Sequence, residues 1–130
     1  MIMEKGRELK FYFCRHCGKI IAILKNSGTP TICCGEPMQE MTPGKEDASV
    51  EKHVPVIRKE GCHALVSVGS VPHPMTTEHY IEWILIHTNQ GLRKQSLTPK
   101  DKPEADFMLQ PEETVISAYE YCSIHKLWKG

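Results

Sequence analysis

The sequence predicts an all-β protein in two parts: a small metal-stabilised module followed by a β-sandwich. Four of the six cysteines lie within residues 14–34, which is a short span for so many sulfur donors. After residue 50 the chain consists of short apolar or alternating runs, each bounded by Gly, Pro, Asn or Asp. None of these runs keeps the apolar period of a long amphipathic helix. Short strands at this spacing are typical of a sandwich.

The N-terminal part has too little apolar sequence to fold without help. Its largest apolar groups are Phe11–Phe13 and Ile20–Leu24. A module of about 40 residues normally needs a metal, a disulfide or a partner to be stable, and a bound metal would supply that stabilisation. We therefore expect a first domain over residues 1–41. A polar linker with Pro and Gly follows over residues 42–50.

The second domain is expected over residues 51–130, built from short strands. Ala64–Val68 is rich in β-branched residues, and the turn Asn89-Gln90-Gly91 joins two runs into a hairpin. Leu109–Glu113 is long enough for one helical turn. The expected strands are Val54–Ile57, Ala64–Val68, Tyr80–Thr88, Gly91–Leu97 and Val115–Tyr121.

Composition limits the function classes. Lys+Arg and Asp+Glu are both 16, and this zero net charge argues against a nucleic-acid-binding protein. No apolar run approaches the roughly 20 residues that cross a bilayer, and residues 1–7 lack the apolar core of a secretory signal. We therefore expect a cytoplasmic protein with no membrane partner. In a reducing compartment, six cysteines and seven histidines indicate metal or redox chemistry.

The four N-terminal cysteines predict a tetrahedral metal site. Cys14 and Cys17 form a C-x2-C knuckle, and Cys33 and Cys34 supply two more sulfurs. Adjacent cysteines must splay apart to reach one ion, so we expect a distorted tetrahedron. Four sulfurs suit zinc and iron equally. The alternatives are a zinc ribbon, which would have a second C-x2-C, or a disulfide pair. His16, inside the knuckle, is expected to be solvated.

A second candidate site comes from the segments Glu51–Pro55, Val71–His79 and Tyr121–His125. All three lie at predicted strand ends or in loops, where a rigid sandwich usually presents its ligands. Prolines on both sides of His73 restrict its backbone. Together the segments offer four imidazoles and one thiolate, from His53, His73, His79, His125 and Cys122.

The donor types narrow the choice of metal. Zinc usually takes four ligands, so this set has one too many. Blue copper takes two His, one Cys and a weak axial Met, and residues 126–130 contain no Met. Four nitrogens and one sulfur fit a five-coordinate iron with one position left for a small oxygen species.

Several motifs follow one another in a specific order. They are Cys14-x2-Cys17, Cys33-Cys34-Gly35-Glu36-Pro37-Met38, Glu51-Lys52-His53-Val54-Pro55-Val56, Gly69-Ser70-Val71-Pro72-His73-Pro74-Met75, His79-Tyr80-Ile81-Glu82-Trp83 and Glu120-Tyr121-Cys122-x2-His125. In this order, and over nearly the whole chain, they resemble desulfoferrodoxin, the two-domain form of superoxide reductase. Cys62 matches none of them.

The resemblance implies a fold and two iron ions per chain. The first domain would be desulforedoxin-like, with a distorted Fe(Cys)4 centre. The second would be an immunoglobulin-like sandwich whose catalytic iron has four equatorial imidazoles and an axial thiolate. The implied ligands of the first iron are Cys14, Cys17, Cys33 and Cys34. Those of the second are His53, His73, His79 and His125, with Cys122 axial.

The resemblance also implies an activity: the one-electron reduction of superoxide to hydrogen peroxide. Glu51 matches a carboxylate that takes the sixth position in the oxidised resting state. Lys52 matches a lysine that attracts the anion and assists protonation. A rubredoxin-like electron donor and a homodimer are implied as well. The alternatives are a non-catalytic iron electron carrier and a zinc-stabilised interaction module.

Overall fold

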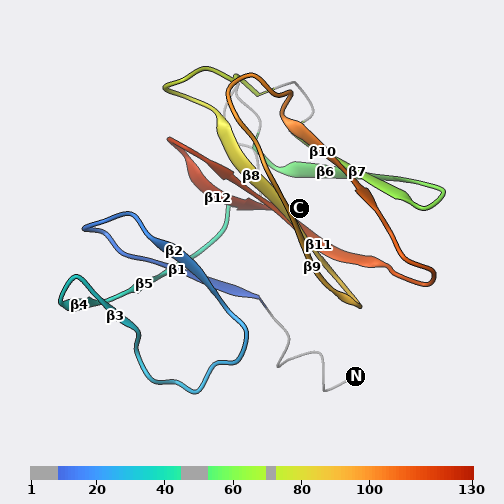
Figure 1. The fold of residues 1–130 in the computed structure, drawn as a ribbon. Helices are drawn as coiled ribbons and strands as arrows, with labels where there is room; N and C mark the ends of the chain where they lie inside the picture. The colour runs from blue at the N-terminus through green and yellow to red at the C-terminus, as the bar shows by residue number, and fades with distance from the viewer. Residues whose placement is uncertain (1–8, 45–52, 70–72) are drawn as a thin grey trace. The chain divides into compact units, whose positions relative to one another are not determined.

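The computed structural model describes residues 9–44, 53–69 and 73–130. The chain divides into two compact units, residues 1–42 and residues 43–130 (Figure 1). The described residues form strands and turns and no helix, so the predicted all-β class is confirmed. It follows that no helix in this part of the chain is long and apolar enough to cross a membrane.

The first unit is a small antiparallel sheet with a separate two-stranded ladder. β1 is the central strand of the sheet, with β2 and β5 on its two sides. Its buried side chains include Phe11, Cys14 and Met38, so one of the few core residues is itself a sulfur donor. The strands are β1 Lys10–Phe13, β2 Ile20–Ile23, β3 Ile32–Cys33, β4 Glu36–Pro37 and β5 Gln39–Met41.

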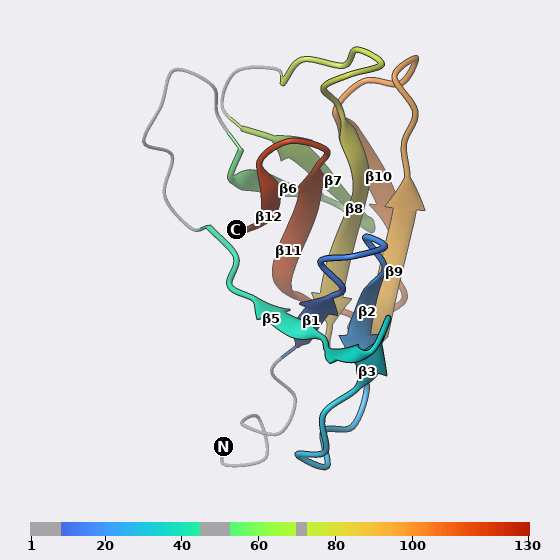
Figure 2. The same cartoon turned by 90° about the vertical axis from the view of Figure 1, so that its left-hand side faces the viewer.

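The second unit is a sandwich of two antiparallel sheets. One sheet has the strand order β10-β7-β6 and the other has the order β12-β11-β8-β9. Figure 2 shows β11, β8 and β9 side by side in one layer, with β6, β7 and β10 behind them. The strands are β6 Pro55–Glu60, β7 His63–Val68, β8 Ile81–Thr88, β9 Gly91–Ser96, β10 Glu104–Met108, β11 Val115–Cys122 and β12 Lys126–Lys129.

The core of this unit lies between the two sheets. β7 alternates strictly, and Ala64, Val66 and Val68 point inward with 0–1% of their surface exposed. Ile84 and Ile86 of β8 face them from the other sheet and belong to the same cluster. Each fully buried side chain of this size contributes about 1.5–3 kcal/mol, so this interface is the main source of the unit's stability.

The structure departs from the sequence prediction in three places. β10 and β12 were not expected, because both are short and each contains charged residues. The helical turn expected at Leu109–Glu113 is a non-helical turn instead. Its backbone leaves the helical region at Glu112, where φ is 64°, and the Glu113 carboxylate accepts the N–H of Gln110 at 2.8 Å.

Candidate metal centres

Strand pairing within each sheet, together with the packing of the two sheets, brings five donors to one end of the sandwich. β6 begins where its antiparallel neighbour β7 ends, and β8 begins where its neighbour β11 ends. His53 lies just before β6, His73 follows β7, and His79 lies just before β8. Cys122 ends β11, and His125 lies in the turn before β12. We call these residues the five-donor centre.

The four imidazoles of the five-donor centre are arranged in a circle, and each lies next to two others. The ring centroids of His53 and His73 are 4.8 Å apart, and those of His73 and His79 are 4.7 Å apart. His79 and His125 are 5.2 Å apart, and His125 and His53 are 4.7 Å apart. Every pair is close to T-shaped, with interplanar angles of 66–86°. Each ring therefore turns an edge toward the shared centre.

The distances between donor atoms suit a single ion. Cys122 Sγ lies 3.5 Å from His73 Nε2 and 3.8 Å from His125 Nδ1. His125 Nδ1 lies 3.0 Å from His53 Nε2, and all five donor atoms lie within 4.8 Å of one another. Metal–nitrogen and metal–sulfur bonds of about 2.0–2.3 Å place opposite donors about 4–4.6 Å apart. The donor set therefore fits one transition-metal ion.

A hydrogen bond orients the imidazole of His73, and a backbone turn places His79. The Nδ1–H of His73 donates to the carbonyl of Pro74 at 2.7 Å, which leaves Nε2 facing Cys122. Such an outer hydrogen bond sets the tautomer of a metal-binding histidine. His79 closes a tight turn, in which its backbone N–H and carbonyl both pair with the backbone of Thr76 at 3.1 and 2.9 Å.

The five-donor centre runs from the core to the surface. Cys122 is fully buried and belongs to the hydrophobic core cluster, and His53 and His73 are buried beside it. His79 is half-buried and His125 is exposed. A thiolate in an apolar core needs a cation next to it, because burial disfavours an uncompensated charge. Of the five donors, His79 and His125 therefore have the most exposed surface.

The four N-terminal cysteines form a second cluster, which we call the four-cysteine centre. Their sulfurs lie within 4.8 Å of one another, and Cys17 Sγ is 3.7 Å from Cys33 Sγ. Two turns bring them together. Gly18 has a φ of 82°, which only glycine adopts at low cost. Cys34 has a φ of 53°, and this left-handed backbone turns Cys34 away from Cys33.

The neighbouring sulfurs of the four-cysteine centre shift one another's pKa, so that ionisation of one thiol disfavours ionisation of the others. The pKa of Cys14 falls to about 6, because the backbone N–H of Cys17 donates to its sulfur. The pKa of Cys34 rises to about 12 and that of Cys33 also rises, chiefly because both pair with the sulfur of Cys14. Four thiolates can share this space only around a cation, which is the chemistry of a metal site with four sulfur ligands.

The structure brings together all nine donors that the sequence singled out, in two separate clusters. Glu51 and Lys52 lie outside the described residues. All six cysteines lie within the described part of the chain and none forms a disulfide, so the disulfide alternative is wrong. His16 is not in the four-cysteine cluster. Its Nε2 lies 2.6 Å from Glu36, which also accepts two hydrogen bonds from Arg15.

Sequence reasoning missed Trp128. Its indole stacks on His53, with ring centroids 4.7 Å apart and an interplanar angle of 15°. Its Nε1–H donates to the carbonyl of His125 at 3.0 Å. Trp128 follows His125 by three residues and belongs to none of the motifs, so its only signal was proximity to a predicted donor.

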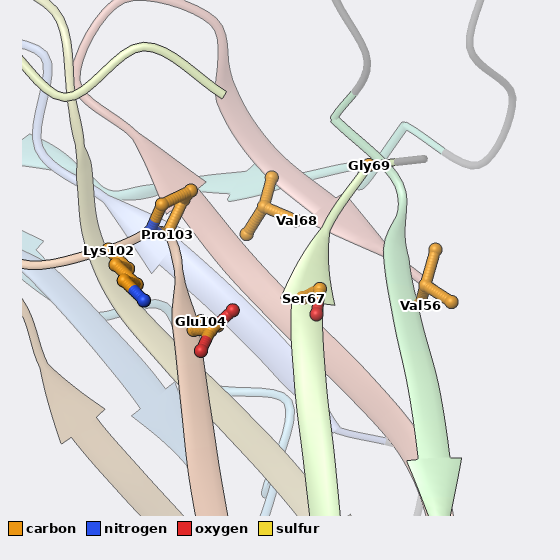
Figure 3. A pocket seen from close by; sticks show the side chains of 7 residues that line it. All are labelled: Val56, Ser67, Val68, Gly69, Lys102, Pro103 and Glu104. Atoms are coloured by element: carbon orange, nitrogen blue, oxygen red, sulfur yellow. The ribbon is translucent and has the colours of Figure 1, made fainter. Parts of the chain in front are cut away.

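A pocket lies at the same end of the sandwich as the five-donor centre, on the side of β10 (Figure 3). It lies where β6 and β10 begin and β7 ends. Its charged groups come from Lys102 and Glu104. None of the nine donors lines it. Its lining residues are Val56, Ser67, Val68, Gly69, Lys102, Pro103 and Glu104.

Models of known protein families match both parts of the chain. The model described as "Desulfoferrodoxin, N-terminal domain" matches residues 6–41. The model described as "Desulfoferrodoxin" matches residues 45–130. The first match contains the four-cysteine centre, and the second contains the five-donor centre.

Individual relatives agree with the family models. Desulfoferrodoxin of Nitratidesulfovibrio vulgaris is 44% identical over 123 residues, covering 95% of this chain and 96% of that protein. Superoxide reductase of Pyrococcus abyssi is 38% identical over 97 residues, covering 62% of this chain and 84% of that protein. The crystal structure of superoxide reductase from Treponema pallidum superposes with a TM-score of 0.83 at 35% identity, covering 96% of this chain and 99% of that one.

Proposed function

This chain belongs to the desulfoferrodoxin family, and from that premise we propose that it is a superoxide reductase whose reaction takes place at the five-donor centre. The observation that carries the proposal is the closed ring of four imidazoles next to a buried thiol. Solved and curated relatives named superoxide reductase support the same activity.

We propose that iron occupies both centres, with the nine clustered side chains as ligands. Iron at the five-donor centre would supply one electron to each superoxide anion. Imidazoles are neutral donors, so four of them with one thiolate leave a divalent ion with about one net positive charge. A positive site attracts an anion and raises its rate of encounter. Carboxylate donors in the same places would cancel that charge.

The protein groups have to supply protons as well as charge. Superoxide takes one electron and two protons to become hydrogen peroxide, so a proton source near the exposed side is required. Lys52 directly precedes His53 in the sequence, and we assign it the roles of attracting the anion and assisting its protonation. Glu51, two residues before His53, would supply a further carboxylate ligand to the oxidised iron.

The electron used in each turnover must come from outside the five-donor centre. A rubredoxin-like protein is the proposed external donor, and the four-cysteine centre is the proposed second iron site. One-electron transfer suits an iron site with four thiolate ligands. The cytoplasmic location remains a prediction from the sequence, and the homodimer remains an expectation from the family resemblance.

Reaction with superoxide tests the proposal directly. The full chain is loaded with iron, reduced, and mixed with a pulse of superoxide in a rapid-mixing spectrometer. We expect fast oxidation of the five-donor centre and one hydrogen peroxide for each superoxide consumed. Dismutation would give one peroxide for every two superoxide anions.

Two outcomes would favour the alternatives. A reduced, coloured protein that does not react with superoxide would be an electron carrier. A colourless protein that gains no stability or spectrum from iron would be a zinc-stabilised module.

His73→Ala is the matched variant for the superoxide assay, because it removes one of the four imidazoles and leaves the four-cysteine centre untouched.

A further inference from the structure

We infer that Trp128 is a positioning residue for two of the four imidazoles, and that residue 44 is glycine to make room for its indole. The inference rests on the proposed function, because it concerns the same five-donor centre. It adds a requirement that the donor side chains do not reveal: an aromatic support that links His53 to His125.

Trp128 contacts two donor segments that are far apart in the sequence. The indole lies nearly parallel to the His53 ring, with an interplanar angle of 15° and centroids 4.7 Å apart. The indole N–H also donates to the carbonyl of His125 at 3.0 Å. One side chain thus contacts the first and the last histidine of the cluster.

Each contact restrains a different degree of freedom. A stacked ring opposes rotation of the His53 imidazole about its side-chain torsions. The bond to the His125 carbonyl restrains the turn from Cys122 to Lys126, where Lys126 has a φ of 69°. His53 Nε2 and His125 Nδ1 are 3.0 Å apart, so a tilt of either ring would change the distances around a shared ion.

The backbone of Gly44 lies against the indole of Trp128. Its N–H donates to the carbonyl of Leu127 at 3.0 Å, and its own carbonyl accepts the N–H of Lys129 at 2.9 Å. These two bonds hold the backbone of residue 44 alongside Trp128. A Cβ at residue 44 would lie 2.6 Å from Cε3 and Cζ3 of the indole, much closer than real Cβ atoms approach.

The requirement for glycine at residue 44 is spatial. Its φ lies outside the left-handed region, so the backbone conformation would accept an alanine. The methyl group would instead press on the indole, which can yield only by moving against its other contacts. Gly44→Ala therefore perturbs the five-donor centre from a residue that is not one of its donors.

Three variants separate the contacts. Trp128→Phe keeps an aromatic ring on His53 and loses the N–H donor, Trp128→Leu loses both, and Gly44→Ala displaces the indole. Trp83→Phe is the matched control, because Trp83 stacks on Tyr121 at 5.8 Å rather than on an imidazole. Each full-length variant is titrated with Co(II), and after iron loading its thiolate-to-iron absorption band is recorded.

We expect the Co(II) affinity of the five-donor centre to fall about 10- to 100-fold in Trp128→Leu, which is the usual effect of removing a group that orients a metal ligand. Trp128→Phe should restore part of that loss, and Gly44→Ala should shift the absorption band. Trp83→Phe should match the wild type. In Trp83→Phe, Trp128 is the only tryptophan, and its fluorescence should be quenched when Co(II) binds.

The outcomes show whether the positioning role of Trp128 fails alone or together with the proposed function. If the wild type binds metal at the five-donor centre while Trp128→Leu and Gly44→Ala keep its affinity and band position, Trp128 has no positioning role. If the wild type itself shows no thiolate band from that centre, the proposed function fails and this inference fails with it. The four-cysteine centre in the same sample is the internal reference for folding and metal loading.

Discussion

Cys122 belongs to the hydrophobic core and to the five-donor centre at the same time. It is fully buried in one cluster with Ile81, Ile84 and Ala118. Its sulfur also lies 3.5 Å from His73 Nε2. Replacing Cys122 by serine or by alanine should therefore separate its packing role from its proposed role as a metal donor.

The cost to the metal-free protein should be small. A buried hydroxyl without a partner costs about 1–3 kcal/mol. Since Sγ of Cys122 lies 3.5 Å from a nitrogen of His73 and 3.8 Å from one of His125, a serine hydroxyl has two partners within a small shift. We expect the free energy of unfolding to fall by about 1 kcal/mol for Cys122→Ser. Cys122→Ala loses a single buried atom and should cost about as much. Either loss corresponds to about 4–8 °C in Tm for a unit of this size.

In the iron-loaded protein, the substitutions should change the absorption spectrum. Both variants remove the only thiol of the five-donor centre, so its thiolate-to-iron band should disappear completely. The assay is an absorption spectrum of each iron-loaded variant, with thermal unfolding of the metal-free form in parallel. Cys62→Ser is the control, because Cys62 is exposed and lies in neither cluster, and it should change neither measurement.

Survival of that band in either variant would show that the sulfur donor is another residue. A loss of Tm in the metal-free protein several times larger than expected would show that Cys122 is retained chiefly for packing.

Three further predictions address other groups. Hydrogen bonds, chiefly from Arg93, lower the pKa of Glu113 from its ordinary 4.5 to about 2, so the ionised carboxylate stabilises the fold above pH 4.5 and that stability is lost as the pH falls toward 2. Glu113→Gln should flatten the dependence of Tm on pH in this interval, and an unchanged slope would contradict the assignment. Lys52→Ala should slow superoxide capture and weaken its salt dependence in rapid mixing, and identical kinetics would remove Lys52 from the reaction. Cys14→Ser should abolish the spectrum of the four-cysteine centre. With excess reductant present, reaction at the five-donor centre should continue, and collapse of turnover would mean that the two centres depend on each other.

Local pattern was enough to predict most of the strands. Val66 and Val68 alternate with half-buried residues along β7, and such a period of two is visible in the sequence. β12 was missed because Lys126–Lys129 is short and bears two lysines, and it forms a strand only by pairing with β11. The turn at Leu109–Glu113 was mispredicted because its conformation depends on the Glu113 carboxylate.

The sequence by itself determined the kinds of donor and their grouping along the chain. The knuckle at Cys14 and Cys17 and the pair Cys122 and His125 are local features, and their spacing already suits a metal. The order of the motifs also pointed to the family. The identity of the bound ions and the ligand roles of the nine side chains stay predictions that the experiments above address.

Only the tertiary structure decided how the donors meet and what supports them. His53 and His125 are 72 residues apart, yet their ring nitrogens lie 3.0 Å apart. His53 precedes β6 of one sheet and His125 follows β11 of the other, so the packing of the two sheets against each other brings their rings together. No local sequence pattern predicts the contacts of Trp128 with His53 and Gly44. They depend on the packing of segments distant in sequence, and no spacing along the chain encodes that packing.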